Sequence, residues 1–183
     1  MKFEYNLTDV GCASGKIVIN RQKLDFDVSY VCDPLSDLLK ALTNLTPGYT
    51  SSDFEGDTAE FDWKGEEASY EWRLRFISFE KLEIEIKAVD DWLATSKKAK
   101  VAIKARVNYF DFIQVVTDEL GKLLKKHGLI GYYASWAYHK EFPLTNYLKL
   151  KYFLEMRRPV AYIDNGNDTF SSVFEKELML MRK

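Results

Sequence analysis

The chain has 183 residues, of which 46% are hydrophobic, 15% aromatic and 30% charged, and its formal net charge is −2. A near-neutral chain has no strong overall attraction to nucleic acid or to an anionic membrane surface, so we expect neither as a partner. It has no apolar N-terminal leader and no apolar run near the roughly 20 residues that span a bilayer, which favours a cytoplasmic protein. Its size and composition predict a single domain over residues 1–183.

Strands are predicted over most of the first 107 residues, because apolar and polar residues alternate there with the period of two that a half-buried strand requires. The short connections between these segments favour antiparallel neighbours. The pattern is weak at 52–63, and at 99–107 it is ambiguous between strand and helix, although the alternation favours a strand. The predicted strands are 2–7, 15–20, 23–31, 52–63, 68–79, 81–89 and 99–107.

The first predicted hairpin allows its register to be derived from the residues that should face the core. Placing Ile17 opposite Phe26 brings apolar residues together across the two strands, with a turn at 20–23. In this register Cys12 and Cys32, the only two cysteines, lie on opposite sides of the sheet. We therefore predict two reduced thiols and no disulfide, as is usual in a reducing compartment.

One helix is predicted inside the strand-rich part, at 33–45. Asp33 is a favourable N-cap residue, and Pro34 suits the first helical position. The residues expected on the buried face are all leucines at helical spacing: Leu35, Leu38, Leu39, Leu42 and Leu45.

The remaining residues, 108–183, are predicted to be rich in helices. Asn108 and Asp111 have the spacing of a capping box, and Gly128 suits the position just after a helix end. Two further helices are predicted, at 143–157 and 170–181. Strands followed by helices predict an α+β fold, with a mostly antiparallel sheet of six to seven strands and a C-terminal helical layer packed on one face.

Charge is segregated along the chain. Residues 53–71 contain eight acidic residues and one lysine, whereas 97–106 contain five basic residues and no acidic one. Such a polarity can dock a partner of opposite charge. The alternative is that both stretches are solvated surfaces or face each other within the fold. The candidate partner contacts are Asp57, Glu60, Asp62, Glu66 and Glu67.

An aromatic stretch, YYASWAYHKEFP at 132–143, is the second candidate contact region. Tyr and Trp are enriched at binding hot spots, but they fill cores equally well, so packing, a partner surface and catalysis all stay open. The candidate contacts here are Tyr132, Trp136, Tyr138 and His139. A pairing of His139 with Glu141 would instead favour an enzyme or small-molecule binder with a pocket between the sheet and the C-terminal helices.

Motifs for specific chemistries are not fulfilled. GCASGKIV at 11–18 lacks the spacing and the Ser/Thr of a phosphate-binding loop. Two histidines and two cysteines scattered along the chain do not form a zinc-binding pattern. We therefore assign no catalytic residue, metal or cofactor. The leading hypothesis is a small protein-binding module, such as an immunity-type inhibitor or an adaptor.

Overall fold

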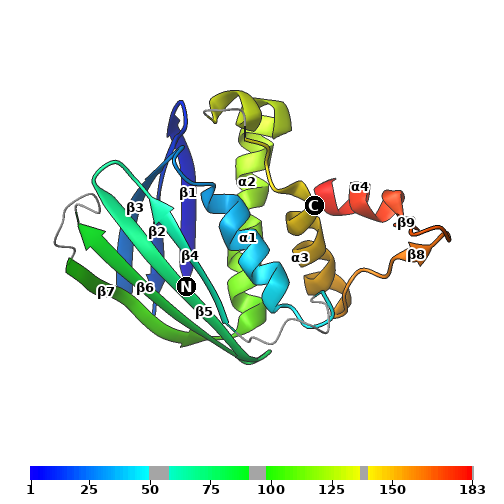
Figure 1. Ribbon diagram of the computed structural model, residues 1–183, viewed down its shortest axis with the longest axis horizontal. Helices are drawn as coiled ribbons and strands as arrows, with labels where there is room; N and C mark the ends of the chain where they lie inside the picture. The colour runs from blue at the N-terminus through cyan, green and yellow to red at the C-terminus, as the bar shows by residue number, and fades with distance from the viewer. Residues whose placement is uncertain (50–57, 91–97, 137–139, 183) are drawn as a thin grey trace.

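The computed structural model describes residues 1–49, 58–90, 98–136 and 140–182. The fold is α+β, as the sequence predicts, with antiparallel sheets on one side and helices α1, α2 and α3 on the other (Figure 1). In chain order the elements are β1 (Lys2–Asp9), β2 (Cys12–Ile19), β3 (Gln22–Ser29), α1 (Pro34–Leu45), β4 (Thr58–Lys64), β5 (Ala68–Ser78), β6 (Lys81–Asp90), β7 (Lys98–Val107), α2 (Tyr109–Ser135), α3 (Leu144–Met156), β8 (Ile163–Asp164), β9 (Phe170–Ser171) and α4 (Phe174–Arg182).

The strands form a three-stranded sheet in the order β1-β2-β3, a four-stranded sheet in the order β4-β5-β6-β7, and the short pair β8-β9. Strand β3 joins the two larger sheets. The side-chain amide of Gln22 donates to the carbonyl oxygen of Lys104 (3.0 Å) and accepts from its N–H (2.7 Å), so it pairs with β7 as a strand backbone would. The N–H of Asp27 donates to the hydroxyl of Tyr70 on β5 (3.3 Å).

One hydrophobic core runs through both larger sheets and α1, α2 and α3. The predicted leucine face of α1 is confirmed, because all five leucines are at most 5% exposed. Trp63 of β4 lies beneath this helix, and its indole N–H donates to the carbonyl oxygen of Pro34 (3.0 Å). The alternation predicted for β5 is also confirmed, with Trp72 and Leu74 buried and Arg73 exposed between them.

The register predicted for the first hairpin is wrong. Ile17 pairs with Leu24, and Gly15 takes the place opposite Phe26. The cause is the turn: Asn20 and Arg21 have φ of 47° and 68°, which closes a two-residue turn of the kind that joins hairpin strands tightly. The pairing therefore shifts by two residues, and an even shift keeps the predicted faces inward.

Both cysteines are free, as predicted, although the positions used to predict this were incorrect. Cys12 lies opposite Ser29, and Cys32 lies beyond the end of β3. Because β3 ends at Ser29, Tyr30 is not a core residue and is 42% exposed.

The helical part differs from prediction at two places. Asn108 caps α2 by accepting from the N–H of Asp111 (3.2 Å), as expected. At Gly128, where we predicted the helix to end, φ is 67° and the helix breaks, but it resumes and continues to Ser135. The segment predicted as a helix at 170–181 begins with β9, and α4 starts only at Phe174.

None of the described helices is both long enough and apolar enough to cross a membrane.

Candidate functional site

The acidic and basic stretches lie at opposite edges of the four-stranded sheet, because the strand order places β4 and β7 apart. Some charges of each stretch are paired with the strand beside it. One row across the sheet reads Glu60, Arg73, Glu85 and Lys104, with alternating charge. Glu60 pairs with Arg73 (3.2 Å) and Glu85 with Lys104 (2.7 Å). The charges of this row thus compensate one another on the folded sheet, whereas Asp62 lies opposite another acidic residue, Glu71.

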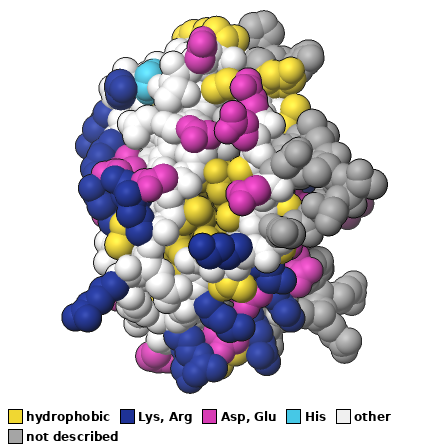
Figure 2. Space-filling view, turned by 90° about the vertical axis from the view of Figure 1, so that its left-hand side faces the viewer, with side chains coloured by type: hydrophobic (Ala, Val, Ile, Leu, Met, Phe, Trp, Pro, Cys, Tyr) yellow, Lys and Arg dark blue, Asp and Glu magenta, His cyan; other side chains and the backbone are white. Residues whose placement is uncertain are grey.

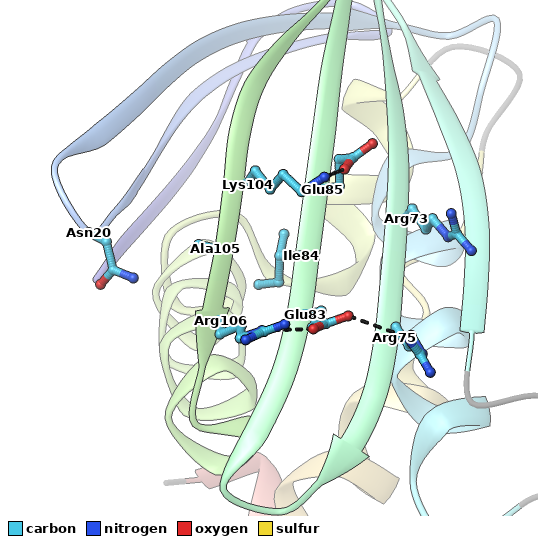
Figure 3. A pocket seen from close by; sticks show the side chains of 9 residues that line it. All are labelled: Asn20, Arg73, Arg75, Glu83, Ile84, Glu85, Lys104, Ala105 and Arg106. Carbon is cyan, nitrogen blue, oxygen red and sulfur yellow. Dashed lines mark hydrogen bonds and ion pairs between the residues drawn. The ribbon is translucent and has the colours of Figure 1, made fainter.

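A second row places Glu83 between Arg106 (2.7 Å) and Arg75 (3.7 Å). An open hollow of about 600 Å³ lies over these rows, with Asn20 of the β2–β3 turn at its edge (Figure 3). Its charged side chains are not buried, so the pairs are solvated surface pairs of about 0–1 kcal/mol each. The hydrogen bond from Lys104 lowers the pKa of Glu85, which keeps that carboxylate ionised.

The other predicted acidic contacts remain accessible. Asp62 is exposed on β4, and Glu66 and Glu67 are exposed in the turn that follows it. Asp57 lies outside the described residues. Viewed from the strand side, acidic side chains gather in the upper part of the surface, and Lys and Arg gather along its left and lower parts (Figure 2).

The aromatic stretch contributes to the core through Tyr132 and Trp136. Both side chains have 0% exposure. Their rings stack with centroids 6.0 Å apart, and the ring of Phe142 meets Tyr132 edge-on at 5.5 Å. In this arrangement Tyr132 and Trp136 present no surface to a partner.

The other residues proposed from this stretch are not placed in a site. Glu141 is exposed. Tyr138 and His139 lie outside the described residues. The pairing of His139 with Glu141 therefore stays a prediction.

Several buried polar atoms have no hydrogen-bond partner in the described part of the chain. They include the hydroxyls of Tyr5 and Tyr132, the indole N–H of Trp136 and one carboxylate oxygen of Asp33. Burial raises the pKa of both phenols, and the charge of Asp33 adds to the increase. A buried polar group without a partner costs about 1–3 kcal/mol, so a polar group that pairs with these atoms would stabilise this region.

The raised pKa of Asp33 predicts how the stability of the fold depends on pH. Burial raises the pKa of its carboxyl above the ordinary value of 3.8, against the opposing charge of Lys140. At pH values just above 3.8, the folded state therefore binds more protons than the unfolded state. The free energy of unfolding then falls as the pH rises from the unfolded-state pKa through the raised folded-state pKa. Asp33 occupies the N-cap position of α1, as predicted, but its side chain makes no cap hydrogen bond, so Asn at this position loses none. We expect Asp33→Asn to raise the melting temperature at pH 7 and to weaken its fall between pH 4 and pH 7.

Thermal unfolding followed by circular dichroism at pH 4 and pH 7 measures this effect. Glu67→Gln removes the same charge at an exposed turn and serves as the control, with an expected change in unfolding free energy of no more than about 0.5 kcal/mol. A lower melting temperature of Asp33→Asn at pH 7 would contradict the prediction.

The C-terminal arm, defined as residues 157–182, carries an apolar surface that sequence reasoning missed. Only Leu180 among these described residues is buried. The large apolar side chains that are exposed here are Tyr162, Ile163, Phe170, Val173, Phe174, Met179 and Met181. In Figure 1 the arm lies on the far side of α3 from the strands.

A signal for this surface was present in the sequence. Residues 178–181 read LMLM, and consecutive apolar residues point to all sides of a helix. The nine-residue helix α4 packs mainly on α3, so it buries Leu180 and leaves Met179 58% exposed. The apolar run 178–181 therefore leaves apolar side chains on the exposed side of α4 as well as on its buried side.

The beginning of the arm is anchored to the domain. The hydroxyl of Tyr49 donates to the carbonyl oxygen of Lys149 on α3 (3.0 Å) and accepts from the N–H of Val160 (3.0 Å). Burial raises the pKa of Tyr49 to about 12, so this hydroxyl stays protonated and able to donate at neutral pH. The guanidinium of Arg157 lies 3.9 Å from the centre of the Phe110 ring.

Comparisons with protein-family models, with curated proteins and with solved structures find no match to this chain. Its function is therefore inferred from its own surfaces. The C-terminal arm is the main candidate, and the buried polar atoms around Tyr5, Asp33 and Tyr132 are the second.

Proposed function

We propose that this protein is a protein-binding module, of the immunity-type inhibitor or adaptor kind, and that it binds its partner with the C-terminal arm. The observation that carries the proposal is the concentration of exposed aromatic, Met and aliphatic side chains on the arm. Phe170 and Phe174 are 64% and 62% exposed.

The energetics support a contact role for this surface. Contiguous exposed apolar groups usually mark an interaction site, and aromatic residues and Met are enriched in interface cores. Burying such surface contributes about 25 cal/mol per Å². The arm adds little to the domain's own core, since Leu180 is its one described buried side chain. Asp62, Glu66 and Glu67 remain exposed on the strand side and are proposed as a separate polar contact surface.

A small-molecule site beside His139 and Glu141 is the alternative proposal. It is favoured by the unpartnered buried atoms of Tyr5, Asp33 and Tyr132, which a polar ligand could satisfy. Lys140, the neighbour of both proposed residues, is close enough to Asp33 to oppose the rise in its pKa.

Site-specific photo-cross-linking in the native cells tests the arm. A benzophenone amino acid replaces Phe170 or Phe174 in separate variants, and Ile77 in the control. Ile77 is exposed too (43%) but lies on β5. We expect a discrete adduct with a different protein from positions 170 and 174 and none from position 77. Adducts that contain only copies of this chain, or equal adducts from all three positions, would contradict the proposal.

A second variant separates binding from folding. Phe170→Ser combined with Phe174→Ser removes two exposed rings, so the free energy of unfolding should change by only about 0.5 kcal/mol per site. With a benzophenone residue at position 179, we expect this variant to lose at least about tenfold in adduct yield, because truncating an interface anchor costs about 2 kcal/mol or more.

A further inference from the structure

A cavity of about 320 Å³ lies between α3 and the C-terminal arm. Its walls are mainly apolar, with Leu148 and Tyr152 from α3 and Val160, Tyr162 and Leu180 from the arm. The volume lies within the range of small-molecule pockets, about 300–1,000 Å³. It is the space of about ten water molecules at liquid density.

Three cations line this apolar cavity: Lys149, Arg158 and Lys176. Within the described residues, no carboxylate lies at ion-pair distance from any of the three. The one acidic residue of the lining, Glu177, already accepts a hydrogen bond from the hydroxyl of Ser172. The lining thus has three positive charges against one negative charge.

Lys149 is positioned by aromatic rings. Its ammonium lies 5.5 Å from the ring centre of Tyr49 and 5.8 Å from that of Tyr162, both within the range of a cation–π contact. Tyr49 is itself held by its hydrogen bonds to α3 and to the start of the arm. The ammonium is therefore held beside the cavity by ring contacts, and its N–H groups are available to donate to a ligand.

Unpaired cations around an apolar wall select the chemistry of the occupant. A neutral apolar molecule would leave the cations unpaired, and a cationic one would be repelled. A carboxylate can accept charge-assisted hydrogen bonds from a lysine ammonium and from the fork of an arginine. Its apolar body would be buried against Leu148, Tyr152 and Leu180.

We propose that the cavity between α3 and the C-terminal arm binds a small anionic amphiphile, namely a carboxylate with an aliphatic chain or aromatic body. The carboxylate lies among Lys149, Arg158 and Lys176, and the apolar body lies between α3 and α4. The cavity shares Tyr162, Ile163 and Val173 with the exposed apolar surface of the arm. Phe170 and Phe174, the two residues tested for the protein contact, lie outside the cavity lining. The inference goes beyond the proposed protein contact and does not depend on it.

Isothermal titration of the full chain with decanoate tests the proposal, with decanol as the neutral probe of the same chain length. We expect one decanoate site and at least about tenfold weaker binding of decanol, because hydrogen bonds to charged groups contribute about 1.5–3 kcal/mol. Equal binding of the two probes, or no decanoate binding up to its solubility limit, overturns the proposal.

Charge reversal locates the head group. Lys176 is an exposed residue of α4, so Lys176→Glu should leave folding intact, and we expect it to weaken decanoate binding at least about tenfold. Lys23→Glu makes the same change on the exposed side of β3 and should leave the affinity unchanged. Equal losses in both variants would show attraction to net charge alone and overturn the site.

Hydrogen exchange places the ligand independently of affinity. We expect decanoate to slow amide exchange at 148–152, 160–163 and 173–180 and to leave the β1–β3 sheet unchanged. Slowing confined to other elements overturns the proposal.

Discussion

Trp63→Ala should lower the free energy of unfolding by about 3–5 kcal/mol, the range for removing a buried aromatic ring from a core. The Trp63 side chain has 0% exposure. Its ring centroid lies 4.6 Å from that of Trp72 and 5.0 Å from that of Phe26, so it joins the two larger sheets. Its loss also leaves the carbonyl oxygen of Pro34, at the start of α1, without its indole donor.

Urea unfolding followed by circular dichroism measures this loss. Ile77→Ala, at an exposed position of the neighbouring strand, is the control and should change stability by no more than about 0.5 kcal/mol. A loss below about 1 kcal/mol for Trp63→Ala would mean that the ring does not connect the sheets as described.

Gly15→Ala should destabilise the protein by about 3 kcal/mol, the upper part of the usual range for overpacking. A β-carbon at this position would overlap the carbonyl oxygen of Glu4 on β1 and the ring of Phe26 on β3. The carbonyl oxygen of Glu4 is a backbone atom of a paired strand, so the overlap can be removed only if a strand moves. The ring of Phe26 fills the space that Gly15 leaves open, which makes glycine part of the packing.

Gly131→Ala is the matched control for this substitution. The nearest atom to a β-carbon there is the Cβ of His127 at 3.7 Å, an ordinary contact, and the residue lies in α2. We expect this variant to be as stable as the parent or up to about 1 kcal/mol more stable, since Ala is the better helix former. If both alanine variants unfold at the same urea concentration as the parent, the close packing at Gly15 is refuted.

Local pattern predicted the elements of this fold because helical and strand periodicity depends only on near neighbours in the chain. The leucine face of α1 and the cap at Asn108 were therefore correct from the sequence. The α+β class was also predicted correctly, and so was a strand at 99–107, which is β7 in the structure. Element ends were less accurate: α2 continues beyond Gly128, where a helix resumes after a single left-handed residue.

The hairpin register shows where local pattern stopped being sufficient. Pairing apolar residues across the strands fits two registers that differ by two residues, because both keep the same faces inward. The left-handed backbone of Asn20 and Arg21 selects the observed register, because it forms a two-residue turn in which Ile19 pairs directly with Gln22. For Arg, such a conformation is uncommon, so the sequence offered no clear sign of a two-residue turn.

The candidate sites depended on tertiary structure more strongly than the elements did. Strand order placed opposite charges beside the acidic and basic stretches, a relation between residues distant in the chain.

By itself the sequence determined most of the strands and helices and which face of each is apolar, but not the short strands β8 and β9. Only the tertiary structure decided which apolar faces find a neighbour. Tyr132 and Trp136 are enclosed by the core, whereas Phe170 and Phe174 extend beyond it. The reason is physical: burial requires a second surface, and the position of that surface is a property of the whole fold.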